Sequence, residues 1–318
     1  MPEPTPAQII QHARSALLQG IVADLADVVV SPSGVRITSF ADTGNKKSVA
    51  FATEWLARVN GEPPQWTVNV VAGKRDGQVY GNQFEELVKS YIEASYIPLA
   101  KSIFGNHNQR VERYTIGGDE DHEDATVDAS FFSKFYQYHG LETLAATLKS
   151  NPHLAASLGN IYEVRPDVVV YQKKPLSETE QMLTACVSCK WTIRSDRVQN
   201  TRVEARNLIN NRVARAPQIV AVTVEPLPSR LKAIAAGTGE IDCTYHVDLP
   251  ALVHAVEAVT RATWKTKWDR LNPARRRMTE VEYIEAGLQS DPQWATLNML
   301  ITGRRLKDII ELPADLLM

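Results

Sequence analysis

Two different spacings of apolar residues divide the chain. The first 60 residues read mainly as helix, interrupted by a turn at residues 31–34 and a break at 43–45. From residue 81 to 104, apolar side chains recur at helical spacing, and a helical pattern resumes over residues 130–158. We therefore predict that most of the first half is helical, with Pro63 and Pro64 ending its N-terminal part.

After residue 163 short β-branched runs replace the helical spacing. Strands are predicted at 168–171, 185–193, 219–224 and 240–247, and a helix at 195–210. Strands that alternate with helices over this length predict an α/β fold with a mixed sheet flanked by helices. Residues 263–290 are charged and break the pattern, so we expect an inserted helical arm there.

A chain of 318 residues can bury one large core, and no internal repeat or low-complexity segment divides it. We expect a single domain in four parts. These are a helical N-terminal region (1–70), a central core (75–262), the arm (263–290) and a C-terminal element (291–318).

Composition narrows the class of protein. The sequence contains no run of eighteen apolar residues, which argues against a membrane span. Its first residues lack the basic stretch followed by an apolar stretch that is typical of a signal peptide, so we do not expect one. Three cysteines are too few for a disulfide framework. We therefore expect a reduced, cytoplasmic protein.

The net charge of −2 does not itself indicate a polyanionic partner, but the distribution of charge is uneven. Eight basic and three acidic residues lie between Arg194 and Lys232, and seven basic and one acidic between Arg261 and Arg277. Each cluster fits a DNA-binding surface and equally fits an ordinary solvated face.

The second predicted strand carries the first candidate chemistry. Side chains alternate along a strand, so Ser188 and Lys190 share one face while Cys189 points to the other. Cys186 also lies on the Ser188 face, so the Cys186-x-x-Cys189 pair is split and a zinc site is not favoured. Asp167 immediately precedes the first strand of this region.

The following helix adds a second acid. Glu204 lies seven residues after Arg197, on nearly the same helix face and about 10 Å further along the axis. Asp167, Lys190 and Glu204 could then supply two oxygen ligands for Mg²⁺ and one fixed positive charge, as phosphodiester hydrolysis requires. The alternative is that the three residues have no catalytic function. Asp167 would then be an ordinary aspartate at a strand end, Lys190 a lysine that reaches solvent, and Glu204 a surface glutamate.

Asp167, Ser188-x-Lys190 and Glu204 together resemble the variant PD-(D/E)xK motif of the CCGG-cutting type II (IIF) restriction endonucleases. In that family a serine replaces the second acid of the strand, and a glutamate from the next helix takes its place. The resemblance continues through residues 188–197, 225–230, 237–243 and 305–309. It covers about 75–265 and 294–318, while the first 70 residues match poorly.

The resemblance implies catalytic roles. Asp167 and Glu204 correspond to the metal ligands, Lys190 to the catalytic lysine and Ser188 to the replaced acid. Glu85, within residues 81–85, corresponds to a further acid of the active site. The implied cofactor is Mg²⁺.

The resemblance also implies how DNA is read. Arg194 and Arg197 correspond to residues that bind guanines of CCGG, and Asp196 to one that accepts hydrogen bonds from cytosine, in agreement with base-edge chemistry. Gln78 and Arg230 correspond to residues that contact the outer base pair from the minor and major grooves. Together they predict cleavage of GCCGGC after the first G, leaving 5′ overhangs with 5′-phosphate ends.

The expected partner is double-stranded DNA. A palindromic site implies a two-fold dimer, and the family resemblance implies a homotetramer of two such dimers in a bacterial restriction-modification system. A structure-specific repair nuclease of the same fold is one alternative, although it would have no use for the residues at 194–197. A non-catalytic, sequence-specific DNA-binding protein is another, although it would not need both carboxylates and the lysine.

Overall fold

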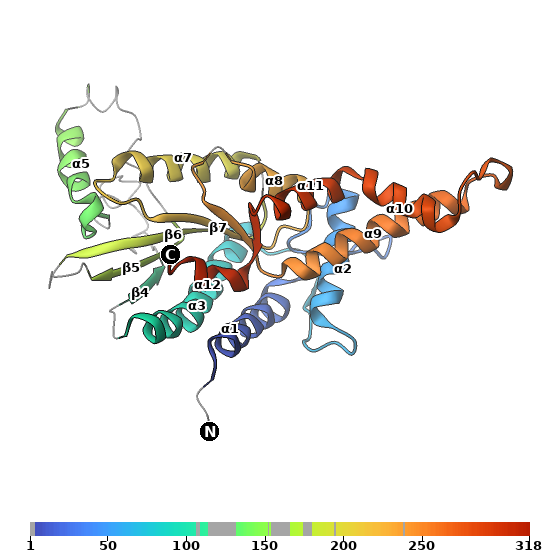
Figure 1. Cartoon of the computed structure of the whole chain (residues 1–318), viewed down its shortest axis with the longest axis horizontal. Coiled ribbons are helices and arrows are strands. Elements are labelled where there is room, and N and C mark those ends of the chain that lie inside the picture. The colour runs from blue at the N-terminus through green and yellow to red at the C-terminus, as the bar shows by residue number, and fades with distance from the viewer. Residues whose placement is uncertain are drawn as a thin grey trace.

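A six-stranded mixed sheet forms the centre of the computed structural model (Figure 1). The structure describes residues 4–105, 109–113, 132–151, 153, 166–173, 180–193, 195–237 and 239–318. The strand order is β4-β5-β6-β7-β8-β9, antiparallel from β4 to β6 and parallel from β6 to β9. The strands are β4 (Gln109–Arg113), β5 (Val168–Lys173), β6 (Gln181–Lys190), β7 (Gln218–Thr223), β8 (Cys243–His246) and β9 (Leu306–Asp308). The predicted mixed α/β architecture is therefore confirmed.

Helices cover both faces of this sheet (Figure 1). One face carries α1 (Pro6–Gly20), α3 (Gly77–Phe104) and the short α12 (Leu312–Asp315). The other carries α7 (Ser195–Asn211), α8 (Pro228–Ala235) and α11 (Pro292–Thr302). Further helical segments are a π-helix at Ile21–Leu25, α2 (Lys46–Asn60), a 3-10 turn at Tyr136–Tyr138, α5 (Gly140–Ser150), and 3-10 turns at Pro273–Arg275 and Ile309–Glu311. Within the described ranges, no helix has the length and apolar character needed to cross a bilayer.

The N-terminal region is less helical than the sequence predicts. Strands β1 (Val28–Val30) and β2 (Arg36–Thr38) form a hairpin, and β3 (Val70–Val71) pairs in parallel with β1. The predicted turn at 31–34 is the hairpin turn, in which Gly34 has a φ of 78° that favours glycine. The helical prediction was wrong for residues 28–30 and 36–38, because strands of three residues are too short to show an alternating pattern.

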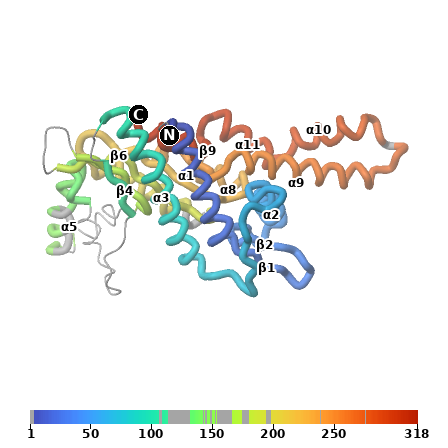
Figure 2. The backbone as a smooth tube through the Cα atoms, turned by 90° about the horizontal axis from the view of Figure 1, so that it is seen from below, coloured from blue at the N-terminus to red at the C-terminus, as the bar shows by residue number. Residues whose placement is uncertain are grey.

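Residues 263–290 are largely helical, as predicted, with a non-helical connection at 270–279 that contains the 3-10 turn Pro273–Arg275. The second half of α9 (Leu249–Asp269) and α10 (Glu280–Ser290) pack against each other and project beyond the sheet (Figures 1 and 2). A Cβ atom added at Gly287 would lie 2.2 Å from Cδ2 of Trp264, so glycine permits the close approach of the two helices. That the arm is an insertion stays a prediction, as do the four parts of the domain.

One edge of the sheet gathers the ends of several elements. Strands β6 and β7 run in parallel, so their carboxyl ends lie together at this edge. The start of β5 lies there too, because β5 is antiparallel to β6. Both α7 and α8 begin just after these strand ends. Parallel strands commonly carry ligand sites at their carboxyl ends, and the candidate residues gather here.

A buried histidine gives a testable contribution to stability. His246 is fully buried against Trp55, and its Nδ1 accepts a hydrogen bond from the Asp248 N–H at 3.1 Å. Burial lowers the pKa of His246 to about 3. The unfolded chain, with a histidine pKa of about 6.5, binds more protons than the folded protein between these values. This contribution is therefore complete above about pH 6.5 and is lost as the pH falls toward 3.

We expect His246→Asn to remove this pH dependence. Between pH 7.5 and 5 the wild type should lose about 2 kcal/mol of unfolding free energy through this group, and the variant should not. Asparagine keeps an acceptor for the Asp248 N–H, so the comparison isolates the titration. Urea unfolding at both pH values measures the difference. Parallel losses in the two proteins would contradict the prediction.

Candidate active site

Asp167 and Lys190 form the centre of the site. Asp167 precedes β5 and therefore lies beside the end of β6. Its Oδ2 accepts hydrogen bonds from Lys190 Nζ at 3.0 Å and from the Cys189 N–H at 2.5 Å. The Ser188 hydroxyl contacts the same oxygen at 3.5 Å. These donors fix the orientation of the Asp167 carboxylate.

The charge of Lys190 depends on its acidic neighbours. The ammonium group is largely buried, and burial alone would lower its pKa. The carboxylates of Asp167 and Glu204 outweigh burial, so the pKa of Lys190 is raised above its ordinary value. Lys190 is therefore a fixed positive charge at neutral pH.

Glu85 adds a third carboxylate from α3. Arg113 on β4 contacts Glu85 Oε2 with Nη2 at 2.9 Å and with Nε at 3.0 Å. Burial and the nearby Asp167 charge raise the pKa of Glu85 against the opposing effects of Arg113 and Lys190. Glu85 thus lies within the electrostatic field of the Asp167–Lys190 pair, as a further acid of the site would.

A cleft of about 280 Å³ brings four of the candidate residues together. Lys190 lines it from β6, Glu204 from α7, and Gln78 and Glu85 from α3. Ser188 lies behind it, in a small crevice that also contacts Glu204. The sequence prediction that Glu204 faces the same side as Lys190 agrees with this arrangement. The catalytic roles of these residues stay predictions.

The donor set is suited to a hard cation. The donors to Asp167 converge on Oδ2, and among the described residues none is bonded to Oδ1. No cluster of three or more His, Cys, Asp or Glu side chains within the described ranges is placed to enclose a metal ion. Mg²⁺ does not need such a cage, because it usually binds one or two carboxylates and completes its shell with water and phosphate oxygens. Asp167 and Glu204 fit that mode of binding.

The cysteines do not contribute ligands to this arrangement. Cys186 and Cys189 are free and buried, and burial raises the pKa of both thiols. A thiolate site for a soft metal is therefore unfavourable here.

A second cleft of about 730 Å³ lies next to the first, and Gly77 and Trp191 line both. Arg230 enters it from α8 and is hydrogen-bonded to Asp42. Arg230 Nη1 also lies 3.9 Å from Oε2 of Glu225. Arg230 is among the residues predicted from the sequence, whereas its partners Asp42 and Glu225, and the Glu85 partner Arg113, are not.

The structure places the segment at 194–197 only in part. Arg194 lies outside the described residues. Asp196 and Arg197 lie in the first turn of α7, where the structure describes the backbone but not these two side chains. The beginning of α7 nevertheless follows directly from Trp191 and Ile193, which line the second cleft.

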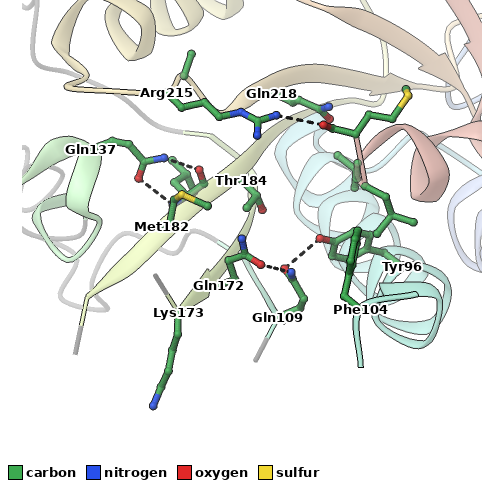
Figure 3. A pocket seen from close by; sticks show the side chains of 15 residues that line it. Tyr96, Phe104, Gln109, Gln137, Gln172, Lys173, Met182, Thr184, Arg215 and Gln218 are labelled. Carbon is green, nitrogen blue, oxygen red and sulfur yellow. Dashed lines mark hydrogen bonds between the residues drawn. The ribbon is translucent and has the colours of Figure 1, made fainter. Parts of the chain in front are cut away.

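A pocket of about 310 Å³ lies at the opposite end of β6 and β7 (Figure 3). Gln109 accepts a hydrogen bond from Tyr96 at 3.0 Å and donates one to Gln172, while Gln137 is bonded to the backbone of Leu183. These amides are thus engaged within the protein. The pocket contains none of the residues proposed from the sequence.

Comparison with known proteins identifies the family. The protein-family model described as "NgoMIV restriction enzyme" matches residues 19–181 and 173–267 of this chain. The type II restriction enzyme NgoMIV of Neisseria gonorrhoeae is 31% identical over 313 residues, spanning 91% of this chain and 92% of that protein. This chain belongs to the NgoMIV restriction enzyme family. It is therefore a DNA-binding nuclease of the type II restriction endonuclease class.

The family match corrects one sequence expectation. It begins at residue 19, so the family match extends further toward the N-terminus than the residues 75–265 expected from the motifs. It ends at residue 267, within α9, so most of the arm lies beyond it. The NgoMIV-like core thus includes α3, the central strands and α7, which line the cleft.

Proposed function

We propose that this NgoMIV-family protein hydrolyses both strands of DNA at a CCGG-containing palindrome, G/CCGGC, in a Mg²⁺-dependent reaction. The products carry 5′ overhangs with 5′-phosphate ends. The observation that carries the proposal is the hydrogen bond from Lys190 to Asp167, because Lys190 also lines a cleft together with Glu204, and the Arg230 cleft adjoins it. Two carboxylates and a fixed ammonium group suit the hydrolysis of a phosphodiester.

In this proposal Asp167 and Glu204 hold the magnesium ion. The ion, when bound, supplies Lewis-acid stabilisation of the charge that develops on the phosphate. Lys190 orients the attacking water and neutralises negative charge near the scissile phosphate. Ser188 holds Asp167 from behind, and Glu85 adds negative charge on the α3 side of the cleft.

The same proposal assigns DNA reading to five side chains. Arg194 and Arg197 bind the guanines of CCGG, and Asp196 accepts from cytosine. Gln78 and Arg230 read the outer base pair from opposite grooves. Support comes from the exposure of Gln78 at the first turn of α3, within the catalytic cleft, and from the position of Arg230 in the adjoining one.

Symmetry extends the proposal to the assembly. A palindromic site is read by a two-fold dimer in which each subunit binds one half-site. Two such dimers would form the proposed homotetramer, acting in the bacterial cytoplasm as the nuclease of a restriction-modification system. Each subunit would be one restriction-endonuclease domain in the four parts expected from the sequence.

The test uses plasmids with zero, one or two GCCGGC sites, incubated with the protein in Mg²⁺ or in EDTA. We expect discrete cleavage at GCCGGC that EDTA and Lys190→Ala each abolish, because both remove required positive charge. Faster cleavage of the two-site plasmid is expected of the tetramer.

Other outcomes separate the parts of the proposal. Cleavage at a different CCGG-containing site would contradict the roles proposed for Gln78 and Arg230 at the outer base pair, while still supporting the proposed active site. Cleavage of branched or nicked DNA regardless of sequence would favour a structure-specific nuclease. Tight site-specific binding without cleavage in any metal would favour a non-catalytic DNA-binding protein.

A further inference from the structure

Glu225 is a buried carboxylate that the catalytic and base-reading assignments leave unexplained. It follows the end of β7, and its side chain has no exposed surface. Burying a carboxylate is costly unless hydrogen bonds and a positive charge compensate it. At Glu225 such compensation comes from two chain segments that meet at this edge of the sheet.

Each oxygen of Glu225 holds the main chain of a different segment. Oε2 accepts a hydrogen bond from the Ile193 N–H at 2.9 Å. Ile193 immediately precedes the segment at 194–197 that reads the inner guanines. Oε1 accepts a hydrogen bond from the Leu227 N–H at 3.1 Å. Leu227 caps α8, which carries Arg230.

The same residue is linked to the catalytic strand. The Glu225 N–H donates to Thr223 Oγ1 at 3.1 Å, and that hydroxyl donates to the Lys190 carbonyl at 2.6 Å. Glu225 therefore joins the end of β6, the start of the inner reader and the helix of the outer reader.

Charge completes the connection. Arg230 Nη1 lies 3.9 Å from Glu225 Oε2, while the other side of the guanidinium is bonded to Asp42. A guanidinium can bind a guanine edge bidentately only when its plane is correctly oriented. Two acids on different elements restrict that orientation before DNA binds.

We propose that Glu225 is a positioning residue that sets the spacing and orientation of the two base-reading segments relative to Lys190. It acts through Ile193, Leu227 and Arg230 and does not touch DNA. The inference rests on the proposed reading roles of residues 194–197 and Arg230. It predicts that one substitution away from the bases weakens discrimination at both the inner and the outer base pairs.

The experiment compares wild type with Glu225→Gln, which keeps the shape but loses the charge and one acceptor. Burial raises the pKa of Glu225 to about 7, so both proteins are compared well above pH 7, where the wild-type carboxylate is ionised. Binding to duplexes with GCCGGC, ACCGGT (outer pair changed) or GACGTC (inner pair changed) is measured in EDTA by fluorescence anisotropy. We expect the preference for GCCGGC to fall about tenfold against each altered duplex, since part of a base contact is lost in both readers. Affinity for unrelated DNA should not change, because phosphate contacts dominate it.

Asp308→Asn is the matched control. Asp308 is also a buried carboxylate that accepts from two backbone N–H groups, of Leu249 and Ile310, and pairs with Arg14. A general loss of stability would affect both variants, whereas loss of discrimination is expected only for Glu225→Gln. Measurements are made well below the unfolding temperature of each variant.

The outcomes separate this inference from the proposed function. If wild type does not prefer GCCGGC, the proposed specificity fails. If wild type discriminates and Glu225→Gln retains the preference against both altered duplexes, the positioning role is overturned. Should the glutamine variant not fold, Glu225→Asp keeps the charge on a side chain one methylene shorter and is expected to weaken discrimination in the same direction. Unchanged discrimination in that variant would equally overturn the inference.

Discussion

Replacing Asp167 with asparagine is expected to slow DNA cleavage by about a thousandfold or more, because the change removes charge from the centre of the site. Asparagine cannot supply an anionic oxygen to a cation. The substitution also removes the carboxylate that offsets the burial of Lys190, so it weakens both charges of the pair. Single-turnover cleavage of a GCCGGC duplex in Mg²⁺ measures the loss.

DNA binding should survive the same substitution. Removing a negative charge from a surface that faces phosphates is expected to leave affinity unchanged or increase it. A double variant with Lys190→Ala should lose little more activity than Asp167→Asn alone, since the two groups act as a unit. Asp308→Asn serves again as a control and should cleave at the wild-type rate. Near-normal cleavage by Asp167→Asn would remove this residue from the active site.

The sequence predicted the four inner strands of the sheet, β5 to β8, for a physical reason, whereas the edge strands β4 and β9 were missed. Parallel strands buried on both faces are continuous apolar runs, and β7 (Gln218–Thr223) is flanked by segments of clearly different pattern. The hairpin of β1 and β2 was missed because its strands have three residues each, too few to display alternation. The valines of β1 directly follow the apolar helical segment at Ile21–Leu25, so the helical prediction was carried through them.

Placement of the candidate site was predictable where it depended on local periodicity. Strand alternation predicted that Ser188 and Lys190 share one face of their strand. Helical spacing predicted that Glu204 faces the same side as Lys190. Pairings between distant segments could not be predicted in this way. Asp42 and Arg230 are 188 residues apart, and Glu85 and Arg113 are 28 apart on different elements. Nothing in a single sequence distinguishes Asp42 from any other loop aspartate.

Replacing Arg230 with alanine is expected to relax recognition of the outer base pair while leaving the CCGG core recognised. The preference for GCCGGC over ACCGGT should fall by about tenfold to a hundredfold, as for the loss of one bidentate arginine–guanine contact. The preference over GACGTC should remain, because Arg194 and Arg197 are unaltered. Competition cleavage of the three duplexes in one reaction, read as relative kcat/KM, measures both ratios.

The control for Arg230→Ala must remove an arginine without touching the cleft. Arg261 is suitable, since it lies on α9 and is paired with Glu257 and Glu285. Arg261→Ala should leave both preferences at the wild-type value. Arg230→Ala also frees Asp42, which is expected to repel phosphates and lower overall affinity for every duplex alike. If affinity falls equally for all three duplexes and the preferences do not change, Arg230 contacts phosphate. Recognition of the outer base pair would then belong to other residues of the cleft.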